Sequence, residues 1–227
     1  MNSLKKTTNS VVIVGGGRSV KEGIELGLWD KIKGHEIWSL NFAFKFMPYL
    51  PTKELWMDTT FFKNITNEIR DLHTAGVELV TKQAEIYNAF PVTQVKVFRS
   101  PAEAPKFPDG LFIGVLGLTG TFALSLAVRM GYEQIFLLGF DYGSPSLDKK
   151  DTHFYQEAVP EKNIKSSGVG NPRIYLDRDG SVKSSVKDYN YFDNSKSLIY
   201  NVSRTTNISV FKIIGYEEFF KLINETR

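Results

Sequence analysis

The sequence has no cysteine, only three histidines, and no long uninterrupted apolar run. Without cysteine the chain has no disulfides, no thiolate nucleophile and no cysteine-ligated zinc site. No apolar run approaches the length of about 18 residues that a membrane-spanning helix needs, so we expect no membrane association. The N-terminus lacks the apolar segment of a secretory signal. Together these absences predict a cytoplasmic protein.

An excess of charge of one sign is also missing. The chain carries 28 Lys and Arg against 25 Asp and Glu, a formal net charge of +3, and no dense basic stripe. Nucleic-acid-binding domains cluster their Lys and Arg, so we expect no nucleic-acid partner. A mildly basic chain suits a small anionic ligand instead.

What is present is a regular alternation of strand-like and helix-like segments over 227 residues. This alternation predicts an α/β fold, a Rossmann-like, mostly parallel sheet with helices on both faces. Residues 1–9 are expected to form a disordered tail and 10–227 a single α/β domain, in which the polar segment 144–193 is an insertion or lid. We expect strands at Ser10–Val14, His35–Asn41, Glu54–Met57, Val77–Lys82, Thr93–Phe98, Leu111–Leu116, Gln134–Leu138 and Ile208–Ile214. We expect helices at Val20–Ile32, Ala43–Leu50, Thr59–Gly76, Phe122–Met130, Asn194–Thr205 and Tyr216–Glu225.

The most informative segment is Ser-Val-Val-Ile-Val-Gly-Gly-Gly-Arg-Ser, residues 10–19. A β-branched strand enters three glycines, Gly15, Gly16 and Gly17, and a helix follows. Glycines let a backbone turn approach an anion closely, and a helix N-terminus favours negative charge. Arg18 and Ser19 add a guanidinium and a hydroxyl. The segment therefore predicts a phosphate or nucleotide site, and the alternative is an ordinary strand–helix connection.

This glycine turn is not one of the common nucleotide motifs. Val20 occupies the last glycine position of the dinucleotide fingerprint, and no P-loop pattern occurs anywhere in the chain.

Small or polar residues also follow the other expected strands. Because ligands of parallel sheets bind beyond the carboxyl ends of the strands, these residues predict one pocket floor. Thr119, Gly120 and Thr121 form either a second anion-binding turn or a simple helix cap. Asn41 suits hydrogen bonding to a base, a ribose or a sugar, or else is a turn residue. Asp58 and Asp141 predict a Mg²⁺ site bridging phosphates, or else act as cap and turn residues.

His153 is the candidate general base. It lies among aromatic residues in the polar segment after Gly143, above the expected phosphate crevice. An imidazole in that place suits proton abstraction. The alternative is a loop histidine without a role.

These motifs resemble a known group of enzymes. The segments Val-Gly-Gly-Gly-Arg-Ser-Val (14–20), Ser-Leu-Asn (39–41), Trp-Met-Asp (56–58), Thr-Gly-Thr (119–121) and Gly-Tyr-Glu-Gln-Ile-Phe-Leu-Leu-Gly-Phe-Asp (131–141) are similar to the MptE-like 6-hydroxymethylpterin diphosphokinase superfamily. Bacterial sialyltransferases that use CMP-sialic acid share the layout. The resemblance covers about residues 10–155.

The resemblance implies roles for individual residues. In the sialyltransferases the matching positions bind a cytidine nucleotide, which implies that role for Gly15–Gly17, Asn41 and Thr119–Gly120, with His153 as base. The sialyltransferases often have Asn where this chain has Asp58. An aspartate there is similar to the MptE-type enzymes, which transfer diphosphate with a divalent metal, so Asp58 is also a catalytic candidate.

The sequence thus predicts a transferase that binds a nucleotide, nucleotide-sugar or diphosphate donor, of glycosyltransferase or diphosphokinase type, with Mg²⁺ as cofactor. The alternative is a non-catalytic nucleotide-binding or assembly protein with the same fold. Donor, acceptor and oligomeric state have no recognisable code in the chain.

Overall fold

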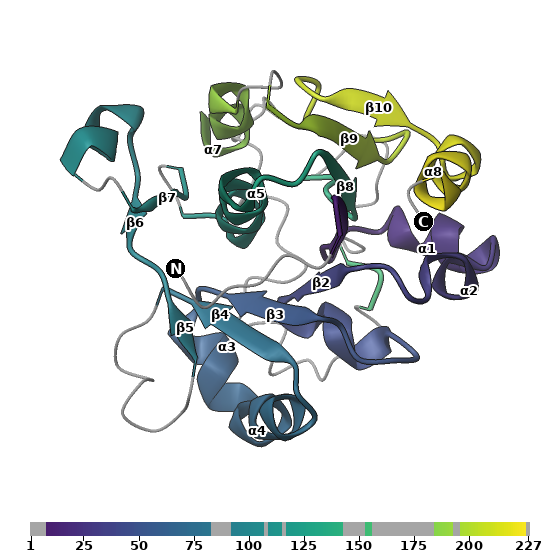
Figure 1. The fold of residues 1–227 in the computed structure, drawn as a ribbon, viewed down its shortest axis with the longest axis horizontal. Coiled ribbons are helices and arrows are strands. Elements are labelled where there is room, and N and C mark those ends of the chain that lie inside the picture. The colour runs from purple at the N-terminus through teal and green to yellow at the C-terminus, as the bar shows by residue number, and fades with distance from the viewer. Residues whose placement is uncertain are drawn as a thin grey trace.

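A parallel sheet organises the chain. The computed structural model describes residues 8–82, 92–106, 109–114, 117–142, 153–155, 184–192 and 196–225. Its main sheet has eight strands in the order β10-β9-β8-β1-β2-β3-β4-β5, and every neighbouring pair is parallel (Figure 1). The α/β fold expected from the alternating pattern is confirmed.

The strands are short and most are buried. Those of the main sheet are β1 (Ser10–Val14), β2 (Ile37–Leu40), β3 (Lys53–Trp56), β4 (Glu78–Thr81), β5 (Thr93–Gln94), β8 (Gln134–Leu138), β9 (Leu198–Val202) and β10 (Lys212–Ile214), and a separate pair is formed by β6 (Val97–Phe98) and β7 (Leu111–Phe112). The α-helices are α1 (Val20–Glu25), α2 (Leu28–Ile32), α3 (Thr59–Asn64), α4 (Thr66–Thr74), α5 (Thr119–Met130), α7 (Ser184–Lys187) and α8 (Tyr216–Asn224). Among the described residues, the 3₁₀ helices are η1 (Asn41–Phe46), η3 (Pro101–Lys106) and η6 (Asp188–Tyr191).

Two hydrophobic cores cover the two faces of the sheet. Successive side chains of a strand point to opposite faces, and β1 sends Val12 and Val14 into one core and Val11 and Ile13 into the other. The first core contains side chains of α1, α2, α3, α4 and α8, and the second those of α5, α7 and η6. Figure 1 shows α5 on one side of β1 and β8, and α1, α2 and α8 on the other.

The order of the strands creates a switch point beside β1. The chain runs outward from β1 through β2, β3, β4 and β5, then returns to pair β8 with the opposite edge of β1. In parallel sheets, ligands commonly bind at such a switch point, beyond the carboxyl ends of the strands. The glycine turn follows β1, and Gly139–Tyr142 follows β8, so both lie at this switch point.

Three predicted helices differ from the structure. The helix expected at Thr59–Gly76 is divided at Ile65, whose φ is −135°, into α3 and α4. The segment expected as a helix at Asn194–Thr205 contains strand β9, whose Leu198–Val202 pairs residue by residue with β8. Its β-branched and aromatic side chains complete the sheet, and this tertiary pairing outweighs the local pattern. The helix expected at Val20–Ile32 is divided into α1 and α2 by Gly27, whose φ of 79° no helix interior adopts.

Other boundaries differ in smaller ways. The strand expected at Thr93–Phe98 is split into β5 and β6, which belong to different sheets. Between β6 and β7, where no helix was expected, lies η3, a 3₁₀ helix that includes Pro105. Of the segment 144–193 predicted as an insertion or lid, only 153–155 and 184–192 are among the described residues, so most of that prediction lies outside them.

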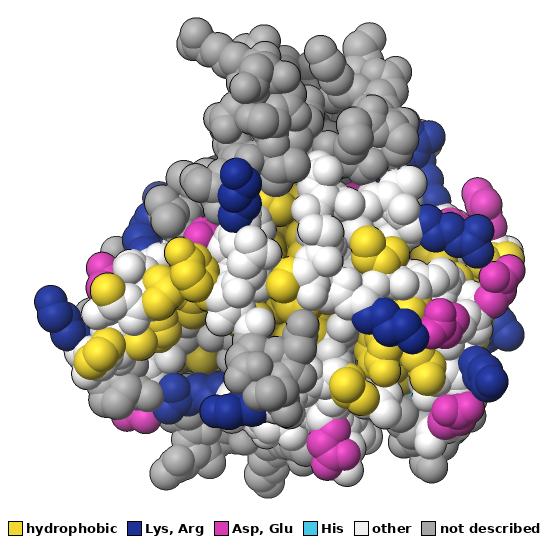
Figure 2. Space-filling model, turned by 90° about the horizontal axis from the view of Figure 1, so that it is seen from above, with side chains coloured by type: hydrophobic (Ala, Val, Ile, Leu, Met, Phe, Trp, Pro, Cys, Tyr) yellow, Lys and Arg dark blue, Asp and Glu magenta, His cyan; other side chains and the backbone are white. Residues whose placement is uncertain are grey.

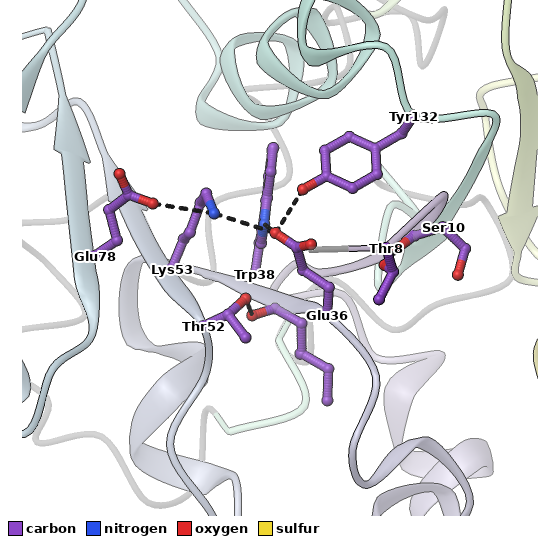
Figure 3. Close-up of polar contacts among 9 residues, drawn as sticks. Thr8, Ser10, Glu36, Trp38, Thr52, Lys53, Glu78 and Tyr132 are labelled. Atoms are coloured by element: carbon purple, nitrogen blue, oxygen red, sulfur yellow. Dashed lines mark hydrogen bonds and ion pairs between the residues drawn. The ribbon is translucent and has the colours of Figure 1, made fainter. Parts of the chain in front are cut away.

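A buried polar cluster ties the strands together at the amino-terminal edge of the sheet, away from the switch point (Figure 3). Glu36 Oε1 accepts hydrogen bonds from the Tyr132 hydroxyl at 2.5 Å and the Trp38 indole at 3.2 Å. Lys53 Nζ lies 3.1 Å from Glu36 Oε1 and 3.0 Å from Glu78 Oε2. These contacts join β2, β3 and β4 to the end of α5, and they fix the register of the sheet.

The surface mixes side chains of every type. Figure 2 shows hydrophobic, basic and acidic side chains interspersed on the face seen from above. The large exposed hydrophobic residues of the described chain include Tyr191, Leu198 and Ile213. Within the same described part, the helices are too short or too polar to cross a bilayer.

Candidate functional site

The glycine turn after β1 packs directly against the turn after β8. The Gly15 N–H donates to Leu138 O at 2.7 Å, and the Gly17 N–H donates to Gly139 O at 2.9 Å. A Cβ on Gly17 would lie 2.5 Å from Gly139 O and 2.6 Å from Asp141 Oδ2. The glycines are therefore required for the close approach of two backbone turns. The N–H groups of Gly15 and Gly17 are thus bonded to the turn after β8. The turn therefore does not present the row of free amides that a phosphate-binding loop would need.

Asp141 locks the same junction. Ser19 donates to it twice, from its N–H to Oδ2 at 2.8 Å and from its hydroxyl to Oδ1 at 2.5 Å. The Ser203 hydroxyl, just beyond β9, donates to Oδ1 at 2.9 Å. Burial raises the pKa of Asp141, and these hydrogen bonds oppose the rise. Asp141 and Ser19 thus brace β1, β8 and β9, and Arg18 lies half-buried between Gly17 and Ser19.

His153 lies on the glycine turn. Its backbone forms an isolated antiparallel bridge with Gly17, and the Phe154 N–H donates to Gly16 O at 2.8 Å. A Cβ on Gly16 would overlap His153 Cδ2 and come within 2.7 Å of the Tyr155 hydroxyl. Burial lowers the pKa of His153 to about 4. The imidazole is therefore neutral at pH 7, in the form that accepts a proton.

Aromatic rings hold the segment that carries His153. Tyr155 stacks on Phe46 with ring centroids 5.2 Å apart, and Phe42 meets Tyr155 edge-on at 6.2 Å. Phe46 also packs against Phe154 at 6.0 Å. Because Phe42 and Phe46 belong to η1, the 3₁₀ helix after β2 positions the segment above the turn after β1.

A pair of tyrosines covers the N-terminus of α5. The hydroxyls of Tyr142 and Tyr189 lie 2.6 Å apart. A Cβ on Gly120 would overlap both hydroxyls, so only glycine fits beneath them. The first N–H groups of an α-helix have no acceptor within the helix, and α5, with its 12 residues, carries a full dipole. This end of α5 thus combines hydroxyls, amides and a positive dipole.

One aromatic ring connects the two turns. The Phe140 ring lies 3.2 Å from the position of a Cβ on Gly15 and 2.9 Å from that of a Cβ on Gly120. The glycine turn and the start of α5 therefore flank the same side chain. The two predicted anion-binding segments therefore lie on either side of the buried Phe140 ring.

The two predicted threonines differ in environment. Thr121 is fully buried, and its hydroxyl faces Ile113 O at 2.7 Å and Leu118 O at 2.8 Å. It supports the start of α5 from inside. Thr119 is half-buried at the first position of the helix, closer to solvent.

Asn41 and Asp58 lie on the other side of β1. Asn41 follows β2 with a φ of 55°, a left-handed conformation that asparagine adopts more readily than most residues other than glycine. Asp58 follows β3 and is exposed. Tyr142 also has a positive φ, 51°, at the end of β8. Such strained residues persist where the surroundings impose them, and they concentrate at functional sites.

The two aspartates predicted to share Mg²⁺ are not neighbours. The sheet order places β1 and β2 between β8, which precedes Asp141, and β3, which precedes Asp58. Three strand spacings amount to about 14 Å, too far for one ion to bind both carboxylates. Within the described ranges no group of three His, Asp or Glu side chains is arranged to hold a metal. The structure therefore does not fit a Mg²⁺ site shared by Asp58 and Asp141. Binding of Mg²⁺ at Asp58 alone stays a prediction.

Sequence reasoning missed several residues of this site. Tyr142 was within reach, since it follows Asp141 directly. Ser203 was missed because β9 was interpreted as a helix. Tyr189 had no local signal, because η6 brings it to Tyr142 from a distant part of the chain.

Comparisons with known proteins add information on the fold. Neither the protein-family models nor the curated proteins contain a match to this sequence. The resemblance to the MptE-like superfamily therefore stays a prediction.

Solved structures do match. The sialyltransferase CstII from Campylobacter jejuni in complex with the substrate analogue CMP-3FNeuAc aligns with a TM-score of 0.52 and 11% identity, over 92% of this chain and 86% of that chain. Its complex with cytidine-5′-monophosphate gives a TM-score of 0.54 at 11% identity, over 93% and 86%. The chain shares its fold with CstII.

A second glycosyltransferase shares this fold. The MAf glycosyltransferase from Magnetospirillum magneticum AMB-1 aligns with a TM-score of 0.53 at 13% identity, over 98% of this chain but 38% of that chain. At such identities the likeness establishes the arrangement of the elements and leaves the chemistry to be argued from the residues.

Proposed function

We propose that the chain is a nucleotide-binding glycosyltransferase that transfers a sugar from a cytidine-monophosphate donor to an acceptor hydroxyl. The observation that carries the proposal is the position of the His153 imidazole, seated on the glycine turn at the switch point of the sheet. Across the Phe140 ring from this turn lies the N-terminus of α5 with its tyrosine pair. The fold shared with CstII, a sialyltransferase whose structure contains CMP, supports this choice of donor.

The donor phosphate suits the N-terminus of α5. Amides and a positive dipole there stabilise negative charge, and the Tyr142 hydroxyl, supported by its hydrogen bond with the buried Tyr189, can donate to the phosphate. Asn41, whose side chain can both donate and accept, suits the base or the ribose. Removing one preorganised donor from such a site costs about 3 kcal/mol of transition-state stabilisation.

The chemical step replaces one bond at the anomeric carbon of the sugar with another. The bond between the anomeric carbon of the sugar and the phosphate oxygen breaks, and CMP leaves with the electron pair. The acceptor oxygen forms the new bond to the anomeric carbon and loses its proton to the imidazole of His153. General base catalysis of this kind contributes about 10²–10⁴-fold to the rate.

The test is turnover of a CMP-linked sialic acid with a mixture of sugar acceptors, followed by release of CMP. We expect wild-type protein to release CMP, and His153→Ala to bind CMP with unchanged affinity but to turn over at least 100-fold more slowly. Tight CMP binding without turnover in wild-type protein would favour the non-catalytic nucleotide-binding alternative. Full activity of His153→Ala would remove His153 from the mechanism.

Asp58 favours a second candidate function, transfer of diphosphate from ATP. An exposed carboxylate at the end of β3 is a ligand type that Mg²⁺ prefers. This candidate predicts AMP release from ATP that requires Mg²⁺ and is lost in Asp58→Ala. Sugar transfer that proceeds without ATP would instead support the glycosyltransferase proposal.

A further inference from the structure

The loop between β9 and β10 hydrogen-bonds to the turn that follows β8. Three successive carbonyls of that turn accept a hydrogen bond from the loop. Thr206 Oγ1 donates to Phe140 O at 2.7 Å. The Asn207 N–H donates to Asp141 O at 3.1 Å, and the Asn207 side-chain amide donates to Tyr142 O at 2.8 Å. Carbonyls that leave the ladder of a sheet need new partners, and this loop supplies one for each.

Asn207 fixes the backbone of Tyr142 from both sides. A peptide group is planar, so the Asp141 carbonyl marks the plane that precedes Tyr142 and the Tyr142 carbonyl marks the plane that follows it. Because Asn207 holds both carbonyls, it sets the two backbone dihedral angles between these planes. Tyr142 needs such a constraint, since its φ of 51° lies in the left-handed region that bulky residues rarely adopt.

The side chain that this backbone directs belongs to the candidate site. The Tyr142 hydroxyl lies 2.6 Å from that of Tyr189, and a Cβ on Gly120 would overlap both hydroxyls. The pair therefore lies directly on the first turn of α5. Because the phenol hydroxyl is at the far end of a long rigid side chain, a change in φ at Tyr142 moves it away from both Tyr189 and α5.

We propose that Asn207 is a positioning residue, which holds Tyr142 in its left-handed conformation and thereby keeps the Tyr142 hydroxyl at the N-terminus of α5. Asn207 contacts neither donor nor acceptor and acts through Tyr142. Its effect on nucleotide affinity rests on the proposed function above, whereas its effect on the tyrosine pair does not.

Asn207→Leu removes the side-chain amide and keeps a branched side chain of similar size without charge. The backbone N–H of residue 207 still bonds to Asp141 O, so the loop stays attached to the turn. If Asn207→Leu does not fold, Asn207→Ser removes the same amide and keeps the position polar.

Ser197→Ala is the matched control. The buried Ser197 hydroxyl donates to Tyr132 O at 2.7 Å and joins the segments that precede β9 and β8. The control therefore also removes one side-chain hydrogen bond to a backbone carbonyl between these two parts of the chain, but at the opposite edge of the sheet from Tyr142.

The first measurement needs no nucleotide. In protein labelled with ¹³C at the ζ carbon of tyrosine, the Tyr189 resonance reports the state of its hydroxyl, and Tyr189→Phe assigns it. Tyr142→Phe removes the partner hydroxyl and should shift this resonance. We expect Asn207→Leu to shift it in the same direction and Ser197→Ala to leave it in place. A Tyr189 resonance that Asn207→Leu leaves unchanged would overturn the positioning role.

The second measurement is a double-mutant cycle on CMP affinity, followed by titration calorimetry. If Asn207 acts through the Tyr142 hydroxyl, its replacement matters only while that hydroxyl is present. We expect Asn207→Leu to weaken CMP binding about fivefold in the wild-type background and less than about twofold in the Tyr142→Phe background. Ser197→Ala should bind CMP within about twofold of wild-type protein.

Equal losses of CMP affinity in the two backgrounds would overturn the positioning role, because they would show that Asn207 and the Tyr142 hydroxyl act independently. If wild-type protein binds no CMP, the proposed function fails. The Tyr189 resonance then still decides whether Asn207 holds Tyr142.

Discussion

Gly16 lies directly beneath His153, so closely that a Cβ on the glycine would overlap the imidazole. The Phe154 N–H donates to the Gly16 carbonyl at 2.8 Å and holds the two segments together. This contact joins the turn after β1 to a histidine 137 positions further along the chain. The candidate base and the glycine turn are therefore one structural unit.

Gly16→Ala should push His153 away from the glycine turn. The new methyl group displaces the ring of His153 and the hydroxyl of Tyr155, so we expect turnover to fall at least about tenfold. The matched control is Gly34→Ala, whose Cβ meets no atom within 4 Å but whose φ is 89°. The control should lose about 1 kcal/mol of stability with unchanged turnover. Stability is measured by urea unfolding and turnover by initial rates, on both variants. Equal turnover in the two variants would contradict the assignment of His153 as the base.

The pKa of His153 predicts the effect of pH on stability. Burial holds it at about 4 in the folded protein, below the value of 6.5 for an exposed histidine. Between these two values the unfolded chain binds the proton and the folded chain does not, so stability falls as the pH drops from about 6.5 to about 4. The loss attributable to His153 is at most about 3 kcal/mol. Urea midpoints measured against pH should show this slope reduced in His153→Gln, and identical slopes would contradict the burial argument.

The same pKa predicts the effect of pH on activity. A base that is neutral above about pH 4 gives a rate that rises with pH through that value and is flat across neutrality. A rate that rises instead with a midpoint near 6.5 would mean that the imidazole is solvated during catalysis.

Tyr142→Phe and Tyr189→Phe should weaken nucleotide binding selectively. Each removes one hydroxyl of the pair above Gly120, and we expect CMP to bind about tenfold more weakly, since a lost hydrogen bond to a charged group is worth about 1.5–3 kcal/mol. Tyr200→Phe, on β9, is a control with the same chemical change away from the switch point. Titration calorimetry of the three variants distinguishes the outcomes. Equal affinities in all three would place the phosphate elsewhere.

Lys53→Met should destabilise the protein without affecting the site. It leaves Glu36 buried with only 1% of its surface exposed and without its ammonium partner. Breaking one side of a buried ion pair costs about 3–5 kcal/mol. We expect a large drop in the urea midpoint, with CMP affinity unchanged in the protein that remains folded. A stability loss below about 1 kcal/mol would show that the cluster contributes little.

Local patterns predicted the parts of this fold that local chemistry determines. β1, β8, α5 and α8 combine apolar runs with clear ends, and Gly131 stops α5 with a φ of 77°. The glycine turn was recognised as special for the same reason. Its role was interpreted differently, because the bonds from Gly15 and Gly17 to β8 depend on a pairing between strands more than 100 residues apart.

The rest of the site depends on the order of the strands. Ser203 reaches Asp141 through β9, Tyr189 reaches Tyr142 through η6, and Glu54 meets Ser39 through the register of β2 and β3. A single sequence carries no record of that register. The same order separates Asp58 from Asp141, which sequence reasoning had combined in one metal site.

The most direct test of the account is titration calorimetry of wild-type protein with CMP, and with AMP and ATP for comparison, each with and without Mg²⁺. The account predicts that CMP binds without Mg²⁺ and that Tyr142→Phe weakens this binding. A concentration 100 times the dissociation constant would then stabilise the fold by about 2.7 kcal/mol. Binding of ATP alone, dependent on Mg²⁺, or no binding of any of the three, would contradict it.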